Sequence, residues 1–261
     1  MSRPQIAVVD YHKGNLSSVA RGLVRAGADA AASDDPAAIA AADALVIPGV
    51  GAFYDAIEFM HASGQDRAIL TAAAAGKPVL GICLGLQLLF ERGDEGVPDG
   101  GGAVVPGDAG AAVPAEGEAA VPGDGSVYGA GLEPGTVFAA EGRRWARGLG
   151  LIRGSCTRLE SSRLKVPHVG WDQVHMTPAG AAGPLLAGVP EGADVYFTHS
   201  YAVDGDVDEA CVLARTHYAR SFACVARSGS VWGCQFHPEK SSATGARILG
   251  NFVQIAREVR S

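Results

Sequence analysis

Residues 81–91 read GICLGLQLLFE and directly follow the apolar run PVL at 78–80. Two glycines flank a cysteine where a predicted strand ends and a predicted helix begins. An apolar strand, Gly-x-Cys-x-Gly and a helix together form the pattern of a nucleophile elbow, a sharp turn that lifts a reactive side chain out of a sheet. The first amides of a helix also favour a thiolate and a developing oxyanion. Cys83 is therefore a candidate nucleophile, and a buried thiol at a strand end is the alternative.

The segments on either side of this elbow predict an α/β fold. Apolar runs at 5–10, 44–48 and 78–83 are expected to be strands, and the apolar spacing over 16–24 predicts a helix with Asn15 as its N-cap. Such alternation is typical of a mainly parallel sheet flanked by helices. Strand-like runs on short turns follow at 194–201, 210–218, 221–226 and 231–236. They predict a smaller antiparallel part, followed by a last helix over about 244–259.

Composition and charge exclude several classes of protein. No apolar run of the 261 residues reaches the ~18 residues that a membrane span needs, and the N-terminus lacks the pattern of a secretory signal, so we expect a cytoplasmic protein. A net charge of −7 argues against nucleic-acid binding. The five cysteines show neither CxxC nor His-paired spacing, which predicts reduced thiols, no metal site and no cofactor.

One acidic, low-complexity segment interrupts the chain. Between Arg92 and Arg143 there are nine acidic residues and no Lys or Arg, and Val-Pro recurs every eight residues, at 97–98, 105–106, 113–114 and 121–122. Gly, Ala, Pro and acids cannot bury enough apolar surface to offset the entropy of ordering such a segment. We therefore expect a single domain over 1–261, with an insertion at about 96–146 that forms a flexible loop.

A reactive thiol needs a base, and His237 is the candidate among seven histidines. It ends the apolar run VWGCQF and lies in the sequence FHPEKS. Glu239 follows two residues later across Pro238, where its carboxylate could fix the tautomer of the imidazole. A hydrolase of the α/β class would instead place its acid between the nucleophile and the histidine. The order Cys, His, Glu therefore argues against a free-standing α/β-hydrolase.

This order, with GICLGLQ and FHPE, resembles the class I triad glutamine amidotransferases. Six further stretches resemble one branch, the glutaminase subunits of imidazole glycerol phosphate synthases of histidine biosynthesis: VVDYHKGNLSSV at 8–19, PGVGAF at 48–53, GLGLIRG at 148–154, KVPHVGW at 165–171, YFTHSY at 196–201 and QFHPEKS at 235–241. The resemblance implies the flavodoxin-like fold of that family. Amidotransferases of the anthranilate or aminodeoxychorismate type, which lack PHVGW and the lysine after FHPE, and a non-catalytic regulator on the same fold are the alternatives.

The resemblance implies a role for each matching residue. Cys83 would attack the side-chain amide of glutamine and form a glutamyl thioester, His237 would transfer the proton, and Glu239 would orient His237. Backbone amides of Val50 or Gly51, with that of Leu84, would hold the oxyanion. The expected glutamine-binding residues are Gln87, Glu95, Thr198, His199, Ser200 and Tyr201, of which His199 is expected to be mainly structural.

The resemblance also implies a partner. Ammonia released into water would be protonated, and the family avoids this by docking on a cyclase subunit. That cyclase is a (β/α)8 barrel that uses the ammonia to make imidazole glycerol phosphate and AICAR. The expected docking residues are Asn15, His168, Val169, Trp171, Tyr196 and Lys240. Three positions depart from the family pattern: His12 and Ala219 stand where glycine is usual, and Asp172 stands where asparagine is usual.

Overall fold

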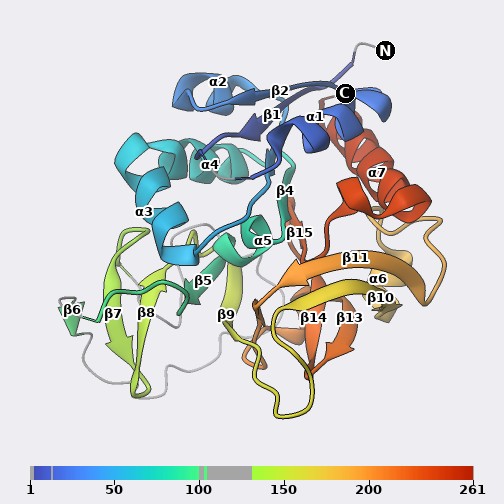
Figure 1. Ribbon diagram of the computed structural model, residues 1–261. Helices are drawn as coiled ribbons and strands as arrows, with labels where there is room; N and C mark the ends of the chain where they lie inside the picture. The colour runs from blue at the N-terminus through green and yellow to red at the C-terminus, as the bar shows by residue number, and fades with distance from the viewer. Residues whose placement is uncertain (1–2, 13, 100–102, 105–130, 261) are drawn as a thin grey trace.

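A nine-stranded mixed sheet crosses the centre of the molecule (Figure 1). The computed structural model describes residues 3–12, 14–99, 103–104 and 131–260. Five parallel strands form one half of the sheet: β2 (Asp29–Ser33), β1 (Gln5–Val9), β3 (Ala44–Ile47), β4 (Val79–Ile82) and β15 (Val231–Cys234). The other half is antiparallel and contains β14 (Arg220–Ser228), β13 (Val212–Tyr218), β10 (His168–Met176) and β11 (Ala193–His199). The predicted α/β fold with a mixed sheet is confirmed.

Helices cover both faces of the parallel strands because alternate residues of each strand point to opposite faces. In β1, Ile6 and Val8 belong to the apolar core beneath α1 (Leu16–Arg25) and α7 (Ser242–Arg260). Ala7 and Val9 belong to a second core on the opposite face. Helices α2 (Pro36–Ala41), α3 (Phe53–Ser63) and α4 (Gln65–Ala74) cover that second core. The strands β1, β3, β4 and β15 are therefore buried on both sides, which explains their continuous apolar sequences, whereas β2 at the edge of the sheet is largely exposed.

Short local signals set the helix ends. The side chain of Asn15 accepts a hydrogen bond from the Ser18 amide, which confirms the predicted N-cap of α1. The elbow helix α5 (Leu84–Leu88) is shorter than the sequence predicts, because the chain leaves it to form β5 (Phe90–Gly93). Three short helices complete the described elements outside the sheets, namely α6 (Pro178–Ala182) and the 3-10 turns η1 (Glu209–Cys211) and η2 (Pro238–Lys240).

A second sheet of six strands packs below the first (Figure 1) and was not predicted. Its strands, in spatial order, are β12 (Tyr201–Val203), β9 (Ile152–Arg158), β5, β8 (Arg143–Arg147), β7 (Val137–Ala140) and β6 (Ala103–Val104). The flexible loop predicted over 96–146 is therefore wrong at 137–146, where β7 pairs with β8 and β8 pairs with β5. Three of the four Val-Pro repeats, at 105–106, 113–114 and 121–122, lie outside the described residues.

Two departures from the family pattern carry backbone strain. His12 has a φ of 60° and Ala219 a φ of 61°, both in the left-handed region that glycine enters without penalty. Ala219 lies in the turn between β13 and β14. A glycine at either position would be free of this strain, which gives a physical reason for the family's usual residue there.

No helix in the described part of the chain is long and apolar enough to cross a lipid bilayer.

Candidate active site

Cys83 lies between β4 and α5 in a strained backbone conformation. Its φ of 56° and ψ of −110° fall in a region that side-chain-bearing residues rarely occupy. The flanking glycines do not supply this conformation, because neither has a positive φ. They supply space instead: a Cβ on Gly85 would lie 1.7 Å from the carbonyl oxygen of Ile47, and one on Gly81 would lie 2.5 Å from that of Gly85. The elbow is thus held by close backbone packing, and the strain falls on the cysteine.

His237 and Glu239 form a buried pair on the turn after β15. The ring Nδ1 lies 2.8 Å from Glu239 Oε1, and both side chains are almost completely buried. A carboxylate accepts only, so Nδ1 carries a proton and donates it. Burial lowers the pKa of His237, but its interaction with Cys83 and the hydrogen bond to Glu239, with the charges of both, together outweigh burial and raise the pKa to about 9. The ring is therefore an imidazolium at neutral pH, and it interacts electrostatically with the cysteine.

A cavity of about 180 Å³ opens beside the cysteine. Its volume is that of roughly six liquid waters, which suits a small amino-acid-sized ligand. The three residues predicted to form the oxyanion site line it, namely Val50, Gly51 and Leu84. The six residues predicted to bind substrate also line it, namely Gln87, Glu95, Thr198, His199, Ser200 and Tyr201. The structure therefore brings together residues that are up to 151 positions apart in the chain around one thiol.

Glu95 supplies a carboxyl group to this cavity. Its Oε2 accepts a hydrogen bond from the amide of Phe53, and its own carbonyl accepts one from the amide of Tyr54. Burial raises the pKa of Glu95 to about 7, and repulsion from Asp94 and Asp55 adds to the rise, while the Phe53 amide lowers it. The group can therefore exchange a proton near neutral pH and, when ionised, can bind a cationic group.

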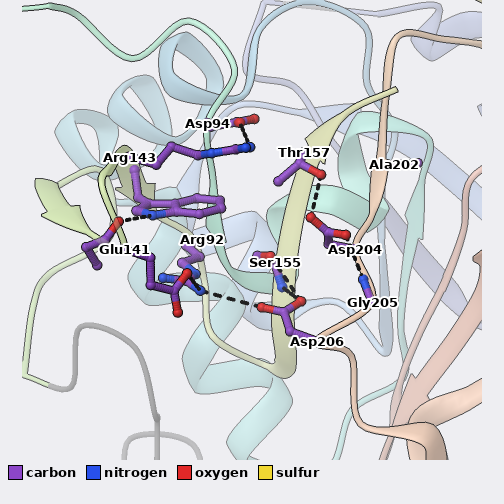
Figure 2. A network of polar contacts seen from close by, with 12 residues as sticks. Arg92, Asp94, Glu141, Arg143, Ser155, Thr157, Ala202, Asp204, Gly205 and Asp206 are labelled. Carbon is purple, nitrogen blue, oxygen red and sulfur yellow. Dashed lines mark hydrogen bonds and ion pairs between the residues drawn. The ribbon is translucent and has the colours of Figure 1, made fainter. Parts of the chain in front are cut away.

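A polar network holds the chain just before Glu95 (Figure 2). Arg143 of β8 donates to Asp94 at 2.6 Å. Beside this pair the buried Arg92 lies over the ring of Trp145, 4.1 Å from its centroid, and its guanidinium lies 3.6 Å from Asp206. These contacts join β5, β8 and the turn after β12 around a second, open cavity of about 320 Å³. Part of the segment predicted as an insertion thus helps to fix the position of Glu95.

Most of the predicted docking residues lie on one exposed face. Val169 and Trp171 of β10 are each about half exposed, which excludes core packing for Trp171. The Trp171 ring lies edge-on to Tyr196, and the Lys240 ammonium lies 5.7 Å from the centroid of the Tyr196 ring. Val169, Trp171, Tyr196 and Lys240 are called the tryptophan face below.

The predicted docking role of His168 is wrong. Its ring is 3% exposed and is stacked between Phe197 and Tyr218, with ring centroids 4.7 Å and 4.0 Å away. Its Nδ1 lies 3.2 Å from His199 Nε2, and His199 Nδ1 donates to the carbonyl of Tyr201. His168 therefore supports the wall of the cavity from inside, and burial lowers its pKa.

The comparison with known families matches this geometry. The model of the class-I glutamine amidotransferases matches residues 7–256 of the chain. The chain belongs to the class-I glutamine amidotransferase family. Among curated relatives, the chain is 40% identical over 248 residues to imidazole glycerol phosphate synthase subunit HisH of Symbiobacterium thermophilum, which covers 95% of this chain and 92% of that protein. It is 38% identical to the HisH subunit of Moorella thermoacetica, over 97% of this chain and 95% of that protein.

Solved structures support the fold alone. A protein solved as a glutamine amidotransferase aligns over 96% of this chain and 98% of its own with a TM-score of 0.61 and 15% identity. A chain of PurLQS from Thermotoga maritima aligns over 99% of this chain and 100% of its own with a TM-score of 0.58 and 14% identity. At these identities the likeness concerns the amidotransferase scaffold, while the site rests on the side chains themselves.

Two residues of this amidotransferase site were not predicted from the sequence. The Gln235 Nε2 lies 3.7 Å from the sulfur of Cys83, and its Oε1 accepts from Nε2 of Gln87. The same Nε2 of Gln87 also donates to the carbonyl of Tyr201, so Gln87 lines the cavity with its amide nitrogen already bonded. Gln235 lies two residues before His237 in the stretch QFHPEKS, and this short distance along the chain is the signal that could have predicted it as a site residue. The second missed residue, Tyr11, lies beneath the loop at 48–51.

Among the residues that the structure describes, no group of three or more His, Cys, Asp or Glu side chains is arranged to hold a metal ion. Cys156, Cys224 and Cys234 are buried in strands, where burial raises the pKa of each thiol above its usual range. These three thiols are therefore unreactive packing residues.

Proposed function

We propose that this chain is the glutaminase subunit of an imidazole glycerol phosphate synthase, in which Cys83, His237 and Glu239 hydrolyse glutamine. The observation that carries the proposal is the strained elbow cysteine beside a cavity, coupled to a buried histidine–glutamate pair. Similarity to HisH subunits over almost the whole chain supports the choice of branch.

The chemistry begins with a thiolate and an imidazolium. Glutamine enters the cavity with its ammonium group beside the Glu95 carboxylate, and the Cys83 thiolate attacks the side-chain amide carbon. The resulting oxyanion accepts hydrogen bonds from the Leu84 amide and from Val50 or Gly51. His237 then gives its Nε2 proton to the departing nitrogen, so ammonia leaves and a thioester remains. The neutral ring next takes a proton from water, which hydrolyses the thioester to glutamate and frees the thiol.

The tryptophan face suits a partner protein. It combines two aromatic side chains with an aliphatic one, and the Lys240 cation lies beside them, a composition common at interface anchors. Thr198, which pairs with Val169 across β10 and β11, lines the cavity. A cyclase barrel docked here would therefore lie beside the cavity. It would also receive the ammonia before water could protonate it.

The test measures glutamine hydrolysis by the purified chain, alone and with a histidine-pathway cyclase and its ribonucleotide ligand. We expect weak activity alone, a large rise with both, and none in Cys83→Ala. Trp171→Ala should weaken complex formation, while Val259→Ala, which trims an equally exposed residue of α7, should not. A rate of glutamine hydrolysis that the cyclase does not change would indicate an amidotransferase with another partner. No hydrolysis under any condition would overturn the glutaminase proposal.

A further inference from the structure

Tyr11 is a buried hydroxyl that the proposed chemistry does not use. It lies two residues after the end of β1, and it is 1% exposed. Its hydroxyl donates a 2.5 Å hydrogen bond to the carbonyl of Pro48. Burial raises the pKa of this phenol, and the charge of Cys83 raises it further. The group is therefore a neutral donor at any physiological pH, and it lies near enough to the nucleophile to interact with its charge.

The hydroxyl also fills the space beside Gly49. A Cβ on Gly49 would lie 1.9 Å from the Tyr11 oxygen and 2.9 Å from the Cβ of Leu84. The amide nitrogen of Gly85 would lie 3.3 Å from the same point. Gly49 is thus held between the tyrosine hydroxyl and the first residues of the elbow helix. The hydroxyl therefore sets the spacing between the loop at 48–51 and the turn that carries Cys83.

A carbonyl held by a hydrogen bond fixes the whole peptide plane, because the peptide bond does not rotate. The Tyr11 bond therefore fixes the plane between Pro48 and Gly49. Among the described residues, no backbone hydrogen bond holds the next two planes, from Gly49 to Gly51, and Gly51 has a φ of 116° that only glycine adopts readily. These two planes carry the amides of Val50 and Gly51, two residues that line the cavity.

We propose that Tyr11 is a positioning residue, whose hydroxyl anchors the oxyanion loop at Pro48 and confines its movement to the amides of Val50 and Gly51. The inference rests on the proposed glutaminase function. An oxyanion donor must be placed within a fraction of an ångström of the developing charge, and removing one such donor lowers kcat by roughly 10²–10³. Loss of the anchor loosens the donor without removing it. The expected effect is a fall in kcat of about tenfold or more.

The first test compares Tyr11→Phe with Tyr218→Phe. Tyr218 is the matched control, since its hydroxyl also donates to a backbone carbonyl, that of Lys165, at 2.6 Å. In Tyr11→Phe we expect kcat for glutamine hydrolysis to fall about tenfold or more, with KM changed less than about twofold. The rate of Cys83 alkylation by iodoacetamide should not change, because alkylation forms no oxyanion. Unchanged kcat, or an equal fall in alkylation, would overturn the proposal.

A second test does not depend on activity. Hydrogen–deuterium exchange is measured by mass spectrometry on peptides that span 46–53, in the wild-type chain and both variants. Tyr11→Phe should exchange at least several-fold faster over this segment, and Tyr218→Phe should not. Equal exchange in all three would show that the hydroxyl does not anchor the loop. If instead the wild type fails to hydrolyse glutamine while the exchange difference is present, the proposed function falls and the anchor stands.

Discussion

Replacement of Glu239 by glutamine tests the electrostatic basis of the triad. The substitution keeps an oxygen that can accept from His237 Nδ1, now at 2.8 Å, but removes the charge. The rise in the His237 pKa from 6.5 to about 9 is equivalent to roughly 3 kcal/mol in favour of the imidazolium. An opposite charge at this range shifts a pKa by roughly 1–3 units. Glu239→Gln should therefore lower the His237 pKa by at least about one unit.

The assay is the pH profile of kcat for glutamine hydrolysis. In the proposed mechanism ammonia leaves only when His237 carries its proton, so the wild-type rate should fall as pH rises through about 9. In Glu239→Gln this decline should begin at least about one pH unit lower. Glu191→Gln is the matched control, because Glu191 holds Nδ1 of His175 at 2.9 Å in an exposed pair. Its profile should equal that of the wild type.

The free energy of unfolding provides a second measure of the interaction between His237 and Glu239. Because the folded-state pKa of His237 is raised, its contribution to stability is complete below about pH 6.5 and is lost as pH rises through about 9. The loss is at most roughly 3 kcal/mol in the wild type. Urea unfolding at pH 6 and pH 9 should show a smaller loss in Glu239→Gln. A kcat profile and a stability difference that both match the wild type would refute the assigned role of Glu239.

Three further predictions concern binding and packing. Burial raises the pKa of Glu95 to about 7, so KM for glutamine should fall as pH rises through 7 and the carboxylate forms. In steady-state kinetics, Glu95→Gln should raise KM at pH 8 and remove this pH dependence. Gly85→Ala, whose Cβ would meet the Ile47 carbonyl, should destabilise the fold by more than about 3 kcal/mol in urea unfolding, whereas Gly250→Ala, in the open on α7, should stabilise it by about 0.5–1 kcal/mol. Ala219→Gly, at a φ of 61°, should raise stability by about 1 kcal/mol, and an unchanged or lower midpoint would contradict the assigned strain.

Local patterns account for what was predicted correctly. The apolar runs of β1, β3 and β4 and the Asn15 cap each depend on residues that are close together in the chain, and the glycines that mark the elbow stand within two positions of Cys83. The spacing of His237 and Glu239 likewise spans a single turn. Such features are set by periodicity, side-chain type and turn geometry, which can be recognised directly in the sequence.

Other features depended on contacts between distant parts of the chain. The strands β7 and β8 are short, and they form because they pair with each other and β8 pairs with β5. His168 was predicted to be a docking residue together with Val169 and Trp171 of PHVGW. In the folded chain its ring instead stacks against Phe197 and Tyr218.

The sequence by itself indicated Cys83 as the candidate nucleophile, His237 and Glu239 as its candidate partners, and most of the strands and helices that carry them, because those signals are local. Only the tertiary structure decided that Glu95 reaches the cavity from the edge of an acidic segment, and that the Tyr11 hydroxyl lies under the loop at 48–51. Burial and hydrogen-bond partners are properties of the assembled fold. A residue 37 positions from its acceptor carries no local sign of that contact.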